Sequence, residues 1–209
     1  ERAAVYRAIR SRRDVRADFT DEPVEDGVLT RILEAAHRAP SVGLSQPWRF
    51  IVVRDLAARR EVRDAFDEAN AAAAQRYEGE QRTRYLSLRL QGILEAPLNL
   101  LVLCDDDPER GQGLGRQTMP ETARYSTVCA IQNLWLAARV EQLGVGWVSI
   151  VDPQALRRIF AVPDRLRIVA YLCVGYVRTF ADEPDLVRAG WEGRVPLEAV
   201  VDYERFGAR

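Results

Sequence analysis

The sequence contains no lysine, and all 30 of its basic residues are arginine. This absence excludes a Walker A P-loop, Schiff-base chemistry and a serine–lysine nucleophile pair, because each of these needs an amine at a defined position. The preference for arginine is also typical of a GC-rich coding sequence, so it predicts no function by itself.

Cysteine and histidine are scarce: the chain has three cysteines, Cys104, Cys129 and Cys173, and one histidine, His37. No two cysteines stand at C-x-x-C spacing, so they indicate reduced core thiols rather than a disulfide scaffold or zinc site, and we expect no metal. A Ser-His-Asp triad could use only His37, and no G-x-S-x-G turn supplies its serine. His37 is better explained as a helix-terminal residue that interacts with the helix dipole.

Long apolar runs and an excess of charge are missing as well. No window of 18 apolar residues exists, and the first residues lack the apolar stretch of a signal peptide, so we expect a cytoplasmic protein without a membrane partner. The net charge is −1 and the pI is about 6.0. This balance argues against nucleic acid as a partner and requires any phosphate recognition to be local.

The length of 209 residues, with 47% hydrophobic and 29% charged residues, predicts a single domain over residues 1–209 with one sizeable core. The apolar run at 98–104 indicates an interior strand that is buried on both faces. Hydrophobic spacing and capping residues predict the other elements. Helices are expected over 3–12, 25–39, 56–77, 83–95, 122–143 and 153–160, and strands over 49–53, 98–104, 146–151 and 168–174.

Two segments contain no predicted element. Residues 105–121 include three consecutive aspartates, three glycines and two prolines, and a loop of this length in a compact domain predicts a lid over a binding site. The Gly-x-Gly-x-Gly spacing that begins at Gly111 is not a dinucleotide fingerprint, because Arg116 stands where the third glycine belongs and no strand leads into it. Residues 175–209 bury too little to be stable alone, so we expect an arm that wraps the core or a partner subunit.

Four arginines lie within seven residues at positions 10–16, with Asp14 among them. Guanidinium groups this close repel one another unless an anion compensates them, and their geometry suits phosphate oxygens. The alternative is that they pair with the acidic stretch 18–26. In this field we expect the pKa of Asp14 to fall, which makes it a carboxylate that accepts a hydrogen bond or a proton, unless it only holds an arginine in place.

Two further segments have the composition of ligand contacts. The Pro40–Trp48 loop offers backbone amides, Ser41 and Gln46 between two prolines, which suits a flat polar ring. At 144–149, glycines allow a ligand to approach the backbone closely. Ser149 interrupts an apolar strand, so its hydroxyl needs a partner, either a ligand or the ladder of its own strand.

In this order, these motifs resemble the nitroreductase-like flavoprotein superfamily over most of the chain. Within that superfamily the chain is most similar to the 5,6-dimethylbenzimidazole synthase branch, on the strength of Asp14, Leu44 and Ser149. General nitroreductases commonly have a small hydroxyl residue at the first of these positions and an asparagine at the second. The matching motifs are Arg-Arg-x-x-Arg at 12–16, Pro-Ser-x-x-x-Ser-Gln-Pro-Trp at 40–48, Gly-x-Gly-Trp at 144–147 and Gly-Trp-x-x-Arg-x-Pro-Leu at 190–197.

The resemblance implies an α+β fold: a nitroreductase-like three-layer α/β/α sandwich around a central mixed sheet of four to five strands, homodimeric with exchanged arms. It also implies bound FMN, with Asp14 and Ser149 as catalytic residues. The implied FMN contacts are Arg12, Arg13, Asp14, Val15, Arg16, Ser41, Leu44, Gln46, Gly146, Trp147, Ser149 and Arg194.

The resemblance implies that reduced FMN is a substrate rather than a lasting cofactor. With O2 as co-substrate it is fragmented to 5,6-dimethylbenzimidazole, the lower ligand of cobalamin, and to erythrose 4-phosphate, and a separate NAD(P)H-flavin reductase supplies the reduced flavin. Asp14 then accepts a proton beside the ring, and Ser149 holds or moves one. Two alternatives stay open: an NAD(P)H-dependent FMN nitro or quinone reductase, and a module that stores reduced flavin without chemistry.

Overall fold

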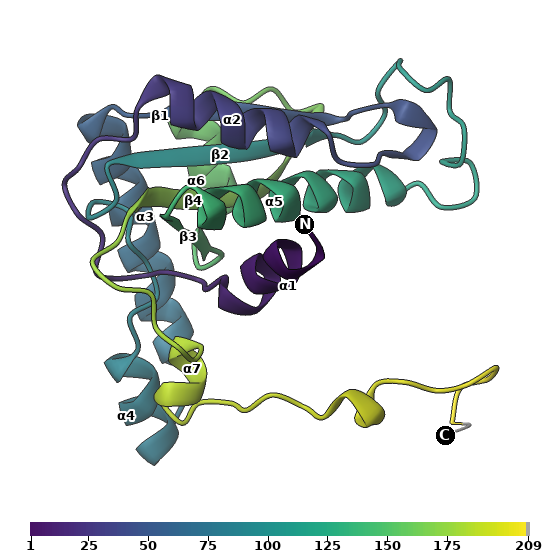
Figure 1. Ribbon diagram of the computed structural model, residues 1–209. Coiled ribbons are helices and arrows are strands. Elements are labelled where there is room, and N and C mark those ends of the chain that lie inside the picture. Colours follow the sequence, from purple (N-terminus) through teal and green to yellow (C-terminus); the bar gives the residue numbers. More distant parts are fainter. Residues whose placement is uncertain (208–209) are drawn as a thin grey trace.

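The computed structural model describes residues 1–207, and a four-stranded sheet in the order β1-β2-β4-β3 forms its centre (Figure 1). All three neighbouring pairs of strands are antiparallel. In the described part of the chain, parallel pairing is limited to one isolated bridge between Asp14 and Val145. The strands are β1 (Trp48–Val53), β2 (Leu98–Asp105), β3 (Leu143–Val148) and β4 (Leu166–Tyr176).

The expected α+β class and the strand count are therefore confirmed, whereas the expected mixed sheet is wrong. The order of strands and helices along the chain does not determine whether neighbouring strands run parallel or antiparallel. Each connection combines a helix with irregular chain, which can return to either end of the sheet. The β1–β2 connection, for example, contains α3 (Leu56–Ala74), α4 (Gly79–Ser87) and 16 residues outside these helices.

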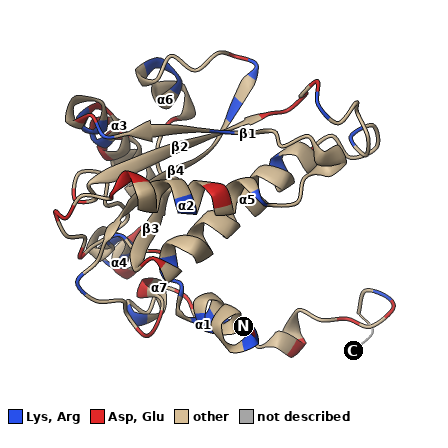
Figure 2. Ribbon diagram, turned by 45° about the horizontal axis from the view of Figure 1, so that its top comes forward, with Lys and Arg blue, Asp and Glu red and all other residues tan. Residues whose placement is uncertain are grey.

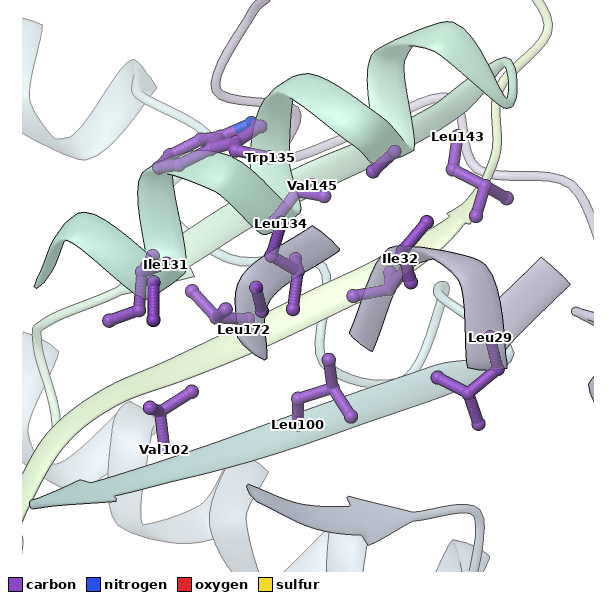
Figure 3. Close-up of a cluster of buried hydrophobic side chains, with 14 of the residues drawn as sticks. Leu29, Ile32, Leu100, Val102, Ile131, Leu134, Trp135, Leu143, Val145 and Leu172 are labelled. Carbon is purple, nitrogen blue, oxygen red and sulfur yellow. The ribbon is translucent and has the colours of Figure 1, made fainter. Parts of the chain in front are cut away.

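Helices cover both faces of the sheet, which gives the expected three layers. On one face, α2 (Asp26–His37) and α5 (Thr122–Val140) pack on Leu100, Val102 and Leu172, as Figure 3 shows. On the other face, α3 and α6 (Pro153–Ile159) pack on the residues that alternate with these along the strands. Since both faces are covered, β2 is buried along nearly its whole length, as its apolar run predicted.

Eight of the 19 residues of α5 are buried, and the helix packs against α2 and the sheet. Its uncovered stripe includes the exposed side chains of Tyr125 and Val128. The short helix α1 (Arg2–Ser11) buries none of its residues, and its apolar side chains Val5 and Tyr6 are also exposed. No helix within residues 1–207 combines the length and the apolarity that crossing a bilayer requires.

Two expected elements differ from the structure. The helix expected at 83–95 is α4, which ends at Ser87 because Leu88 is extended and the Ser87 hydroxyl donates to the Arg84 carbonyl at 2.7 Å. The strand expected at 146–151 is β3 at 143–148, because Gly144 pairs with Gly175 inside the sheet instead of only ending the preceding helix. Ser149 consequently lies one residue beyond the strand.

The arm expected at 175–209 begins with the end of β4 and then leaves the body of the molecule. Trp191 contacts the rings of Tyr77 and Tyr85, at 5.5 and 6.2 Å between centroids, after α7 (Asp185–Arg188). Beyond it the chain runs outward, with one short 3₁₀ helix, η2 (Leu197–Ala199), as Figure 1 shows. The apolar side chains of this outer part are exposed: Val195, Leu197, Val200, Tyr203 and Phe206.

Candidate functional site

The structure fixes Asp14 against the edge strand β3. The Val15 amide donates to the Val145 carbonyl at 2.9 Å, which forms the parallel bridge. One carboxylate oxygen of Asp14, Oδ1, accepts from the Trp147 backbone amide at 3.0 Å, and the other, Oδ2, forms an ion pair with Arg16. Because separate donors hold the two oxygens, the carboxyl group has one defined orientation.

Glycine at position 146 makes this approach possible. A Cβ on Gly146 would lie 2.0 Å from the Val15 carbonyl oxygen, and one on Gly144 would lie 2.7 Å from a methyl group of Val177. We expected these glycines to admit a ligand, but the group that the structure brings against Gly146 is the chain's own backbone. This contact explains Gly146 without a ligand, and its role in FMN binding stays a prediction.

Burial raises the pKa of Asp14 above its usual 3.8, and the charges of Arg16 and Arg12 and the Trp147 amide oppose this shift without cancelling it. The arginines do lower this pKa, but the prediction that it falls below its usual value is wrong because burial outweighs them. Counting charges along the sequence could not show how much solvent the carboxyl group loses in the fold. A carboxylate with a raised pKa is a better proton acceptor near neutral pH than an ordinary one.

The clustered arginines have different surroundings. Arg13 donates to the carbonyls of Arg10 and Arg12, at 2.8 and 2.7 Å, and to that of Asp182. The Arg12 guanidinium donates to no residue within 1–207 and lies 4.9 Å from the centroid of the Trp135 ring. None of the ion pairs among described residues joins these arginines to the acidic stretch 18–26, so that alternative is wrong.

Trp135 organises this segment and was missed by the sequence analysis. Its indole Nε1 donates to the Arg13 carbonyl at 3.1 Å, and its ring carries the Arg12 guanidinium. It is a core residue of α5, but hydrophobic spacing along the sequence does not reveal where an indole nitrogen donates. Burial lowers the pKa of Arg12, and the nearby charge of Arg194 acts in the same direction, which places the arm close to Arg12.

A second group of predicted FMN contacts lies apart from Asp14, beside the start of α5. It consists of Ser41, Leu44 and Gln46. The Val42 amide donates to the Ser126 hydroxyl at 3.0 Å, near the start of α5, whereas Asp14 and Arg13 lie near Trp135 on the same helix. Nine residues of helix span roughly 13 Å. A single chain therefore brings together Arg12, Arg13, Asp14, Val15, Arg16, Gly146, Trp147 and Arg194, but not Ser41, Leu44 and Gln46.

Ser149 is exposed and follows β3 directly. Its hydroxyl makes no hydrogen bond within the described part of the chain, so the alternative that it bonds its own ladder is wrong. Trp147, two residues earlier, holds Asp14 through its amide. The structure thus places Ser149 on the same strand end as Asp14 with its hydroxyl free to meet a ligand.

A cavity of about 620 Å³ borders Arg13, Asp14 and Val15 on one side and residues 179–183 on the other. This volume is within the range of pockets that hold cofactor-sized ligands. Figure 2 shows acidic and basic residues interspersed over most elements. The lining of this cavity is mixed as well, with two arginines and five acidic residues.

Comparison with known proteins identifies the fold and its relatives. The sequence model of the Nitroreductase family matches residues 9–176. The chain belongs to this family. It is 49% identical to the 5,6-dimethylbenzimidazole synthase of Rhodospirillum rubrum over 90% of this chain and 89% of that one, and 46% identical to that of Rhodobacter capsulatus over 94% and 95%. The resemblance to this branch of the nitroreductase family is therefore confirmed.

Solved structures agree with the family assignment. The oxidized iodotyrosine deiodinase bound to FMN and 3-iodo-L-tyrosine superposes with a TM-score of 0.77 at 23% identity, covering 97% of this chain and all of that one. A putative nitroreductase in complex with FMN from Desulfovibrio desulfuricans has a TM-score of 0.64 at 25% identity and 97% coverage of both chains. The nitroreductase-like fold is therefore confirmed.

We predict that Gly146→Ala lowers the free energy of unfolding by about 2 kcal/mol or more, because the new methyl group must displace the Val15 carbonyl or β3 itself. Gly27→Ala is the control: its Cβ would meet only the flexible Arg31 side chain at 3.7 Å, and helix propensity favours alanine by up to about 1 kcal/mol. Urea unfolding of both variants measures the difference. Equal stability would contradict the close approach.

We predict that the raised pKa of Asp14 makes the free energy of unfolding decrease as pH rises. Since its pKa is raised in the folded state from 3.8, the folded protein binds this proton more tightly than the unfolded chain does. The stabilisation is complete below pH 3.8 and is lost as pH rises through the folded pKa. Asp14→Asn removes this dependence, so the variant should gain stability relative to the parent as pH rises. Urea midpoints from pH 4 to 8 measure it, and a difference independent of pH would contradict the raised pKa.

Proposed function

We propose that this protein is a 5,6-dimethylbenzimidazole synthase that fragments reduced FMN with O2 into 5,6-dimethylbenzimidazole, erythrose 4-phosphate and a third fragment that carries the pyrimidine ring of the flavin. The observation that carries the proposal is the identity of 43–49% to synthases of that name over nine-tenths of the chain. Asp14, Leu44 and Ser149, the residues that separate this branch from general nitroreductases, support it.

The residues around Asp14 suit FMN. The Nε atoms of Arg13 and Arg16 are buried without a hydrogen-bond partner, and the guanidinium of Arg12 has no acceptor in the described chain. Buried donors without acceptors are unfavourable, and an anionic ligand with several oxygens would satisfy them. We therefore assign Arg12, together with Arg194 from the arm, to the phosphate of FMN, while Arg13 mainly holds the segment through its three carbonyl contacts.

Asp14 is the residue that we assign to proton transfer. The bound reduced flavin supplies the electrons for O2 and the carbon atoms of the product. Release of the benzimidazole requires removal of a proton from the ribityl carbon beside the ring, and Asp14 is assigned as its acceptor, with Arg16 and the Trp147 amide fixing its orientation. Ser149, at the end of the same strand, holds or moves a second proton near the middle of the ring.

We further infer that a complete site needs two copies of the chain. Ser41, Leu44 and Gln46 lie roughly nine helical residues of α5 away from the Asp14 segment, so they reach a flavin held by a second copy more readily than one held by their own. The uncovered apolar side chains of α1, of α5 and of the outer arm support a homodimer with exchanged arms. A separate NAD(P)H-flavin reductase is the proposed source of reduced FMN.

The decisive test supplies reduced FMN and air and measures 5,6-dimethylbenzimidazole by mass spectrometry. We expect one product per FMN lost, and for Asp14→Asn a yield lower by about 10²- to 10⁴-fold, as for other general bases. The asparagine Oδ1 still accepts from the Trp147 amide, so FMN binding should persist. Asp21→Asn, an exposed residue of the same segment, is the matched control. Full survival of FMN through many NAD(P)H turnovers would instead support a reductase.

We predict that Arg12→Ala weakens FMN binding by about 1.5–3 kcal/mol, since a charge-assisted hydrogen bond is lost. Arg2→Ala, at the exposed start of α1, should leave the affinity unchanged. Fluorescence titration with FMN measures both. Parent-like affinity in Arg12→Ala would remove this residue from the phosphate site without affecting the assignment of Asp14.

A further inference from the structure

Two loops far apart in sequence pack backbone against backbone: residues 41–46, here the 41–46 loop, and residues 105–121, here the 105–121 loop. A Cβ on Gly111 would lie 2.8 Å from the Gly43 carbonyl oxygen, and one on Gly115 would lie 2.8 Å from a methyl group of Val42. Figure 1 shows both loops beside the first turn of α5. The first and last glycines of the Gly-x-Gly-x-Gly run, which matched no nucleotide motif, thus allow this contact.

We propose that the 105–121 loop is a brace that holds the 41–46 loop in its flavin-contacting conformation, and is not a lid. The proposal rests on the proposed function in one respect, namely that Leu44 and Gln46 contact FMN. The brace itself acts on the 41–46 loop through Gly111 and Gly115, whose missing side chains let the two backbones meet.

The 41–46 loop needs such support because its backbone is strained. Gly43, Leu44 and Gln46 have φ values of 57°, 52° and 48°, and the last two are residues that rarely adopt this region. Residues in such conformations persist only where the surrounding structure holds them, and they cluster at ligand contacts. The strain also aims the Leu44 side chain outward: it is 68% exposed although it is a large apolar residue.

Ion pairs hold the first two residues of the 105–121 loop, here called its root, against the core. Asp106 accepts two hydrogen bonds from Arg124 of α5, at 2.8 and 2.6 Å, and one from Arg167 of β4 at 3.0 Å. Asp105 pairs with Arg165 at 3.1 Å. These contacts tie the root to two separate elements of the core, and the hydrogen bonds from Arg124 lower the pKa of Asp106, which keeps it ionised.

The second half of the 105–121 loop is hydrogen-bonded to the residues that follow the root. The guanidinium of Arg116 donates to Asp107 at 2.8 Å and to the Pro108 carbonyl at 2.9 Å, and its side chain is almost fully buried. A lid needs a root that can hinge. Here both ends of the segment that carries Gly111 and Gly115 are held, and its middle presses on the 41–46 loop, so the arrangement favours a fixed support.

A pair of alanine variants separates bracing from general loop strain. Gly111 and Gly113 have φ values of +80° and +75°, so alanine is equally strained at both, but a Cβ at Gly113 meets no atom within 4 Å. We expect Gly111→Ala to raise the dissociation constant for FMN about tenfold relative to Gly113→Ala, measured at a temperature at which both variants are fully folded. We also expect it to change the visible circular dichroism of the flavin at saturating FMN, which loss of stability alone would not do. Equal FMN affinity and equal flavin spectra in the two variants would overturn the proposal.

A compensating pair covers the case in which Gly111→Ala does not fold. Gly115→Ala should weaken FMN binding because its methyl group presses on Val42, and the double variant Gly115→Ala with Val42→Ala should restore binding because the opposing methyl group is gone. Absence of rescue would count against the brace. Product formation by the parent protein is measured separately, so a parent that binds FMN but makes no benzimidazole contradicts the proposed function and leaves the brace to be judged by FMN affinity.

Discussion

The site depends on one close contact, the approach of the Val15 carbonyl to Gly146. This contact lets the segment after α1 join the edge of the sheet as a parallel bridge, although every pair of true strands is antiparallel. Without it the Trp147 amide could not reach the carboxylate of Asp14. The position of the proposed proton acceptor is therefore a consequence of backbone packing, and the ion pair with Arg16 refines its orientation.

The electrostatics of Asp14 follow from this placement. Insertion between β3 and the arginine segment removes solvent from the carboxyl group, and the loss of solvation exceeds the attraction of the neighbouring guanidinium groups. Arg13 adds little to that attraction because carbonyl groups hold its guanidinium. A carboxylate that is partly desolvated yet oriented by two donors has the properties expected of a general base, and the buried Nε atoms of Arg13 and Arg16 have no acceptor among the described residues.

The other part of the proposed site, the 41–46 loop, is positioned by loop packing and not by the sheet. The 41–46 loop holds its strained backbone by packing against the 105–121 loop and contacts α5 at Ser126, nine residues before Trp135. The α5 helix thus contacts two half-sites at different points along its length. Two copies related by symmetry would bring unlike halves together, and the exposed outer arm is the segment available to link them.

The buried strand β2 and the run around Asp14 follow from patterns that are local in the chain, and the resemblance to the family implied the three-layer fold. The family motifs likewise identified the nitroreductase family, because each motif is a short run of neighbouring residues that can be recognised without the fold. Strand direction, the raised pKa of Asp14, the donors of Trp135 and the purpose of the three glycines in 111–115 did not follow. Each of these depends on which distant segment lies within a few ångströms and on how much water it displaces, and only the folded chain specifies those distances.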